Sequence, residues 1–108
     1  IKDLDPKKVS KIGDEDWVYQ EFYYRRSRAF QELGFKDKAL AGFLKSSTWE
    51  EHETYSLGNS LLQIALLYEE KSNFKESRRY FLKALSLKSY AFHEGVHQKA
   101  RAGLERMP

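Results

Sequence analysis

A histidine-containing string near the C-terminus is the part of the sequence whose residue types could perform catalysis. His93, Glu94 and His97 form the pattern H-E-x-x-H, in which two imidazoles one helical turn apart can bind zinc while the glutamate acts as a general base. Such a site needs a third protein ligand, and Glu105 is the sole acid after His97. We therefore interpret both histidines as surface residues of a closing helix. Metal binding by the pair alone, and a zinc hydrolase completed by a ligand such as His52, are the alternatives.

No other pattern in the sequence indicates catalysis. The chain has no cysteine, and its six glycines are scattered singly along it. The nucleophile motif G-x-S-x-G and the glycine-rich phosphate loop are both absent. Adjacent carboxylates such as Glu69 and Glu70 are typical of solvated helix faces. We therefore expect no enzymatic activity, no bound metal and no cofactor.

Composition and charge indicate a soluble, helical, single-domain chain of 108 residues. The net charge of +3 comes from 19 basic and 16 acidic residues that are spread along the sequence, whereas nucleic-acid binding usually needs a concentrated basic stripe. The longest apolar-rich run, residues 61–68, is far shorter than the roughly 20 residues of a membrane span. We expect an intracellular, cytoplasmic location, with no nucleic-acid partner and no membrane span.

Helix-forming residues dominate the sequence, and the only two prolines are Pro6 and Pro108, so long helices are permitted and no strand is predicted. Gly34 should end the first long helix, and Asn73 with Glu76 should cap the fourth. In the uncertain segment 46–56, Thr48 and Glu51 match a capping box, whereas residues 52–56 could equally form a loop. After a lead-in segment at residues 1–13, the pattern predicts helices at about 15–33, 36–47, 55–71, 74–88 and 90–106.

The first four helices read as two hairpins that carry the same residue classes 38 positions apart. We expect small residues to face rings, with Ala65 against Phe81 and Ser27 against Phe43. The matching residues of the second hairpin are Leu61, Ile64, Ala65, Tyr68, Ser72, Asn73, Phe74, Ser77, Phe81 and Ala84. Those of the first are Tyr23, Ser27, Phe30, Leu33, Gly34, Ala39, Phe43 and Ser46. The apolar face predicted for the first helix consists of Trp17, Tyr19, Phe22, Tyr23, Phe30 and Leu33.

This pattern resembles the consensus of the tetratricopeptide repeat (TPR), a 34-residue helix-turn-helix. The match covers the whole second hairpin, whereas the first has Lys36 where the consensus has an aromatic residue, with Phe35 one position earlier. The resemblance implies an all-α, right-handed solenoid fragment. Its TPR domain spans residues 14–106, with hairpins at 14–47 and 55–88 and a capping helix at 90–106. A polar outer side of that cap would come from His97, Gln98, Lys99, Arg101 and Glu105.

A second, fainter resemblance concerns the run from Tyr55 to Leu104. This run is similar to the last hairpin and closing helix of the eukaryotic inclusion-body-clearance family of TPR proteins. The residues that carry it are Lys88 and Tyr90, followed by His97, Ala102 and Leu104.

The TPR resemblance implies a scaffold or adaptor whose concave groove binds a peptide or helical segment of a protein partner. Tyr24 and Arg28 are the anchors that we favour, since aromatic and arginine side chains dominate binding hot spots. The full predicted groove consists of Glu21, Tyr24, Arg28, Gln31, Asn59, Leu62, Gln63, Leu66, Glu69 and Arg101.

TPR domains that grip the acidic C-terminal tail of a chaperone use lysine and asparagine at set groove positions. Tyr24, Arg28 and Gln63 stand where Lys, Asn and Asn would be expected. The resemblance therefore implies a different peptide partner. The alternative is a structural role, as a segment of a longer repeat protein or a repeat that associates with its own copy, because two repeats are fewer than a stable stack usually needs.

Overall fold

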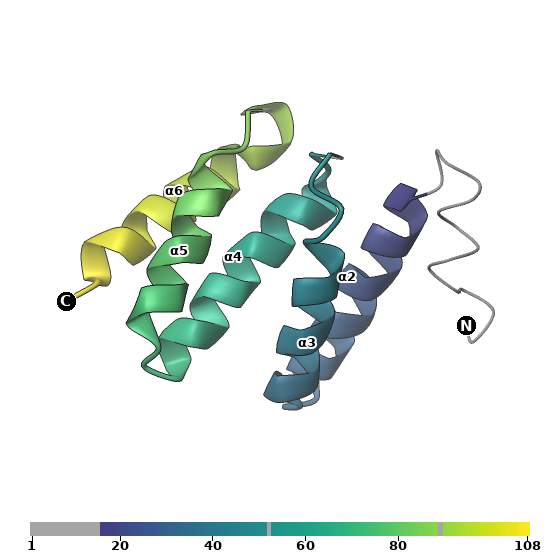
Figure 1. Cartoon of the computed structure of the whole chain (residues 1–108), viewed down its shortest axis with the longest axis horizontal. Helices are drawn as coiled ribbons and strands as arrows, with labels where there is room; N and C mark the ends of the chain where they lie inside the picture. The colour runs from purple at the N-terminus through teal and green to yellow at the C-terminus, as the bar shows by residue number, and fades with distance from the viewer. Residues whose placement is uncertain (1–15, 52, 89) are drawn as a thin grey trace.

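Five α-helices make up the described part of the chain. The computed structural model describes residues 16–51, 53–88 and 90–108, and for residues 90–93 it describes the backbone alone (Figure 1). The lead-in predicted at residues 1–13 lies outside the described residues. Within them there is no strand, so the all-α prediction is confirmed, and each boundary falls within about three residues of its predicted place. The helices are α2 (Asp16–Glu32), α3 (Lys36–Ser46), α4 (Tyr55–Glu70), α5 (Phe74–Leu85) and α6 (Tyr90–Arg106).

The turns inside the two hairpins have the same backbone geometry. Gly34 and Ser72, which are 38 positions apart, have φ values of 87° and 59°, in the left-handed region that often ends a helix. The amides of Phe35 and Asn73 then donate to carbonyls five residues earlier, each over 2.9 Å. Ser72 adopts this conformation without being glycine, at a cost of about 1 kcal/mol or more. The duplication read from residue classes is therefore also a duplication of backbone structure.

The link between the hairpins differs from one of the predictions. The Oγ1 atom of Thr48 donates to the carbonyl of Lys45 over 2.7 Å, so Thr48 lies in the turn that follows α3 and does not begin a helix, and the capping-box alternative is wrong. Thr54 caps α4 instead, and accepts from the amide of Leu57 over 3.1 Å. The predicted cap of α5 is confirmed, because the Asn73 side chain accepts from the amide of Glu76.

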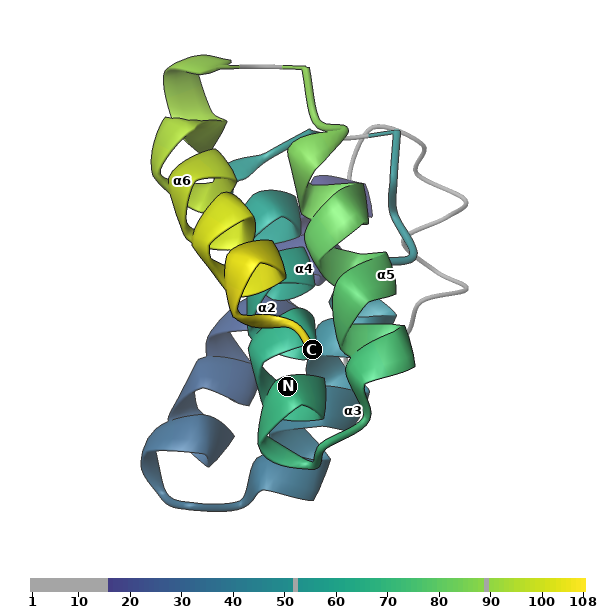
Figure 2. The same ribbon diagram turned by 90° about the vertical axis from the view of Figure 1, so that its left-hand side faces the viewer.

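The helices form two layers, and α4 contributes to both hydrophobic cores. In Figure 2, α2, α4 and α6 make one layer and α3 and α5 the other; α3 packs between α2 and α4, and α5 between α4 and α6. The first core fills the space between α2, α3 and α4, and the second the space between α4, α5 and α6. The first contains Tyr24, Ala39, Leu40, Phe43, Ile64 and Leu67. The second contains Leu57, Leu61, Leu62, Ala65, Phe81, Ala84, Leu87, Val96 and Ala100.

The buried face of α2 is the predicted one only in part: Tyr19 is buried and Phe30 packs against the first core. Leu33 is 71 % exposed because it follows the end of the helix, and Trp17 is exposed in its first turn. Tyr24 occupies the first core in their place. Tyr23 and the buried Tyr19 stack on Trp49, with ring centroids 6.0 and 6.1 Å away. A ring from the link thus covers the start of α2.

Small residues allow the helices to approach closely. Ala65 and Phe81 lie in the same core as expected, and the Ser77 hydroxyl donates to the Ala65 carbonyl over 2.7 Å. Ser27, which was expected to face Phe43, lies against Gly42. None of the helices among the described residues is long and apolar enough to cross a membrane.

Candidate functional site

Three of the predicted groove residues line one hollow on the layer formed by α2, α4 and α6. Glu21, Tyr24 and Arg28 lie one helical turn apart along α2, and Tyr55, the first residue of α4, closes the hollow from the other side. Its volume is about 400 Å³. The complete lining of this first hollow is Glu21, Tyr24, Arg25, Arg28, Ala29, Glu32 and Tyr55.

The cations of the first hollow differ in their availability. The Nε atom of Arg25 donates to Oε1 of Glu21 over 2.9 Å, an i, i+4 pair on the helix surface. Arg28 forms no hydrogen bond or ion pair within the described part of the chain. Its half-buried guanidinium can therefore receive a carboxylate through two parallel hydrogen bonds.

Tyr24 exposes less of its side chain to a partner than the sequence predicted. Its ring is buried in the first core, tilted against Phe43 with the centroids 6.0 Å apart and edge-on to Tyr55 at 6.2 Å. Burial raises the pKa of Tyr24 above its ordinary value, and the neighbouring Arg28 guanidinium partly opposes this shift. Tyr55 is 58 % exposed, so it is the ring that a partner can reach.

A second hollow adjoins the first on its α6 side. It has a volume of about 170 Å³ and again includes Tyr55, together with the predicted residue Asn59 and with Lys99. The Nδ2 atom of Asn59 donates to the Tyr55 carbonyl over 3.1 Å. The complete lining is Tyr55, Asn59, Leu62, Gly95, Val96 and Lys99. Because Tyr55 lines both hollows, they adjoin each other, and we call the two together the groove.

Leu62 is not available to a partner. Its side chain is 1 % exposed and lies in the second core. It occupies the same place in the second hairpin as Tyr24 does in the first, since the two are 38 positions apart. Both were assigned to the groove, and in both hairpins this position turns toward the core instead. Leu66 is partly buried and packs against the second core.

Three other predicted residues bind within the protein. The Nε2 atom of Gln31 donates to Oε1 of Gln63 over 2.8 Å and joins α2 to α4. The Glu69 carboxylate accepts from Nη2 and Nε of Arg106 over 2.8 and 3.1 Å, which fastens the end of α6 to α4. Arg101, the last predicted residue, is exposed on α6 and forms no hydrogen bond or ion pair among the described residues.

The Glu69–Arg106 ion pair makes the free energy of unfolding depend on pH. The Arg106 hydrogen bonds hold the pKa of Glu69 below its ordinary value. The stabilisation is therefore present above the unfolded pKa, about 4.3, and is lost as pH falls through the lower folded value. Because the Arg106 side chain is half exposed, we expect the ion pair to contribute less than about 1 kcal/mol to the free energy of unfolding.

Urea unfolding at pH 7 and at pH 3 measures this contribution. The Glu69→Gln variant should lose less free energy of unfolding than the wild type over this interval. Glu105→Gln, which removes an exposed carboxylate of α6 without an ion pair in the described residues, should behave like the wild type. Identical pH dependence of the wild type and Glu69→Gln would contradict the assignment.

One histidine of the string, His97, does not lie on the surface as we expected. His97 is 2 % exposed, so it belongs to the interior face of α6 and not to its polar side. The side chain of His93 and the whole of His52 lie outside the described residues. No group of three or more histidine and acidic side chains that could hold a metal ion occurs among the residues that the structure describes.

Sequence reasoning missed several residues that line the groove. Tyr55 was assigned only as the start of a helix, although an exposed ring at the first position of α4 is an obvious candidate contact. Arg25, Ala29 and Glu32 follow the same stripe of α2 as Glu21 and Arg28, and this i, i+4 spacing would have found them. Lys99 was assigned only to the outer side of the cap.

Comparison with known proteins identified no relative of this chain. No protein-family model matches the chain, and no match was found among curated proteins or among solved structures.

Proposed function

We propose that this chain is a TPR-type interaction module that binds a peptide or helical segment of a protein partner in the groove. Two helical hairpins that repeat the same turn at Gly34 and Ser72 support the TPR assignment. The arrangement of α2, α4 and α6 in one layer also supports it, because in repeats of this kind the first helix of each hairpin lines the binding side. A solenoid of this type works by presenting an extended surface.

One observation carries the proposal: an exposed aromatic ring stands between two hollows, beside an arginine that has no ion pair among the described residues. Tyr55 offers a large apolar surface that loses little conformational entropy on binding. Arg28, in the first hollow, offers a bidentate site for a carboxylate. The partner segment therefore carries an apolar or aromatic side chain near an acidic one.

The acidic tail of a chaperone is not the ligand in this proposal. Tyr24 stands where that clamp needs a cation, and its ring is buried. Gln63 stands where an asparagine amide is needed, and its side chain is held toward α2 by the hydrogen bond that its Oε1 atom accepts from Gln31. Of the three clamp positions, Arg28 is the one that offers a cation to a free carboxylate at a peptide terminus.

Selection of displayed peptides tests the proposal. A library of random peptides, about 12 residues long so that an extended peptide spans more than the groove, is selected against the immobilised chain. We expect enriched sequences that combine an aromatic or aliphatic residue with Asp or Glu. Arg28→Ala and Tyr55→Ala should each weaken a selected peptide by about tenfold or more, as expected for central anchors, measured by calorimetry.

The matched control is Lys36→Ala, an exposed cation on α3 in the other layer, and it should leave this binding unchanged. Equal loss in Lys36→Ala and Arg28→Ala, or tight binding of a chaperone-tail peptide, would contradict the proposal.

A second candidate role, packing against a further helix, is favoured by the outer face of the first hairpin. Arg26 lies over the rings of Phe22, Tyr23 and Phe30 at 5.1–5.8 Å, and Phe35 is exposed beside them. Sedimentation equilibrium of the protein used in the peptide selection distinguishes the two roles. A monomer at micromolar concentration supports the interaction module, and a dimer supports self-association.

A further inference from the structure

The outer face of α5 carries two parallel rows of side chains. The first row consists of Phe74, Arg78, Leu82 and Ser86, spaced four residues apart, and the second row, one position further, consists of Lys75, Arg79 and Lys83. Side chains four residues apart on a helix lie one above the other. This face is opposite the buried Ser77, Phe81 and Ala84. We call these seven residues the α5 stripe.

The α5 stripe forms a concave surface whose exposed lining is mainly apolar. It lines a depression of about 760 Å³ that Pro108 borders. Leu82 is 52 % exposed, and Phe74 lies beside it with about a third of its surface exposed. Arg78 is turned aside, because its Nη2 atom donates to the Pro108 carbonyl over 3.2 Å. An apolar side chain from outside can therefore reach Leu82 and Phe74.

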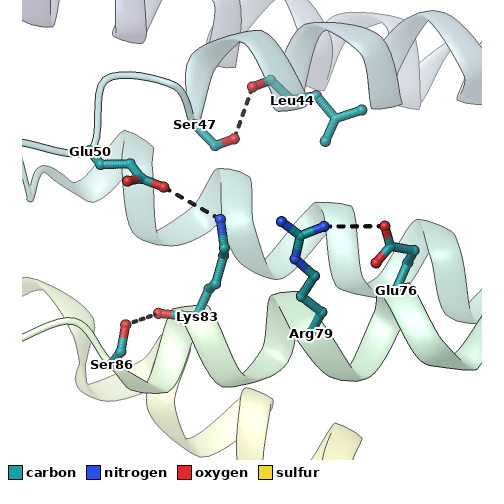
Figure 3. Close-up of polar contacts among 7 residues, drawn as sticks. All are labelled: Leu44, Ser47, Glu50, Glu76, Arg79, Lys83 and Ser86. Atoms are coloured by element: carbon teal, nitrogen blue, oxygen red, sulfur yellow. Dashed lines mark hydrogen bonds and ion pairs between the residues drawn. The ribbon is translucent and has the colours of Figure 1, made fainter.

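The second row is cationic and only weakly neutralised. Figure 3 shows Arg79 directed along α5 toward Glu76 and Lys83 directed toward Glu50 in the link after α3, at N–O distances of 3.3 and 3.4 Å. Such exposed pairs contribute little, so an external carboxylate can replace either partner. Lys75 forms no ion pair among the described residues. The three cations of this row thus face two carboxylates.

We propose that the α5 stripe is a second docking surface, for an acidic amphipathic helix of a protein partner. The two rows require a ligand with apolar residues along one line and carboxylates along the adjacent line. A helix with leucine at positions i, i+4 and i+8 and glutamate beside them meets both requirements at once. The surface lies on the other layer from the groove, so the inference does not depend on the proposed groove function.

The shape of the stripe favours a protein partner over a membrane or a nucleic acid. Membrane-surface helices insert projecting apolar side chains, whereas Phe74 forms part of a depression and projects little. Duplex backbones are bound by cations, and single-strand binding adds several exposed rings on which successive bases stack, whereas the stripe offers the one partly exposed ring of Phe74. A depression that receives side chains is typical of a protein interface.

Fluorescence anisotropy with a defined peptide tests the proposal. The probe is a labelled helical peptide of about 18 residues, or five turns, with leucine at every fourth position of one line and glutamate on the adjacent line. We expect saturable binding to the full chain that weakens between about 50 and 300 mM NaCl, because the Debye length falls. The double variant Lys75→Glu, Arg79→Glu should reduce the affinity by about tenfold or more.

Leu82→Gln should also reduce the affinity by about fivefold or more, because it removes apolar contact area without altering charge. The control Arg101→Glu reverses an exposed cation of α6 and should leave the affinity unchanged. Circular dichroism shows whether each variant folds.

Four results would overturn the proposal. These are absence of binding, equal binding of a scrambled peptide of the same composition, unchanged affinity in both stripe variants, and loss of affinity in the control. Stripe-dependent binding to vesicles containing about 30 % phosphatidylserine without peptide binding would assign the stripe to membranes. Failure of the groove selection would leave this result unaffected, so the two proposals are tested separately.

Discussion

Replacing Gly103 by alanine is expected to destabilise the protein by about 1–3 kcal/mol, equivalent to a fall of roughly 5–15 °C in Tm. A Cβ atom at Gly103 would collide with three atoms of the Phe81 ring. Phe81 is completely buried between α4, α5 and α6, so its ring has no free space into which it can move. Thermal unfolding followed by circular dichroism at 222 nm measures the effect.

Gly95→Ala is the matched control in the same helix. A Cβ atom at Gly95 meets no atom within 4 Å, and the residue is exposed in the middle of α6. Alanine is the better helix former, so this variant should be more stable by about 0.5–1 kcal/mol. Equal shifts of Tm in the two variants would show that α6 does not pack on Phe81 as described.

Replacing the buried Gln20 by methionine is expected to cost about 1–3 kcal/mol, since it leaves two partly buried polar groups without their partner. The Nε2 atom of Gln20 donates to the Trp49 carbonyl over 2.8 Å, and its Oε1 atom accepts from Oγ1 of Thr54 over 2.6 Å. Methionine has a similar volume, so the loss reports hydrogen bonds more than packing. Urea unfolding gives the free energy.

Gln98→Met, at an exposed position of α6, is the control and should change stability by less than about 0.5 kcal/mol. If Gln20→Met were as stable as the control, the link between the hairpins would not depend on the Gln20 bonds. A large loss would explain how this unusually long link is held in place.

Local chemistry made the helices predictable. Gly34 takes the left-handed conformation, and Asn73 caps the next helix, in the manner expected from their types alone. Ser72 repeats the conformation of Gly34 at the corresponding place of the second hairpin. Such effects act over a few residues, so they can be predicted from the local sequence.

The link between the hairpins was not predictable in the same way. Thr48 and Thr54 are both acceptable caps by type. Their roles are decided by Gln20, which lies 34 residues before Thr54 and binds its hydroxyl. A contact of that range depends on the packed arrangement of α2 and α4, and no local pattern encodes it.

The groove was predicted in part for a related reason. Glu21, Arg28 and Asn59 do line it, because periodicity along a helix fixes which residues share a face. Periodicity does not fix the angle at which the neighbouring helix covers that face. Tyr24 and Leu62 lie at the edge of the face and are buried, whereas Glu69 is engaged by Arg106 from a helix 37 residues away.

The central claim is that the groove around Tyr55 binds a protein segment, and chemical-shift mapping tests it most directly. A peptide selected on the wild-type chain is titrated into the isotope-labelled protein, and amide shifts are followed in two-dimensional NMR spectra. We predict shifts concentrated at the amides of Arg28, Tyr55, Asn59 and Lys99, with little change along α3 and the outer face of α5. Shifts confined to α3 and α5, or spread evenly over the molecule, would contradict the claim.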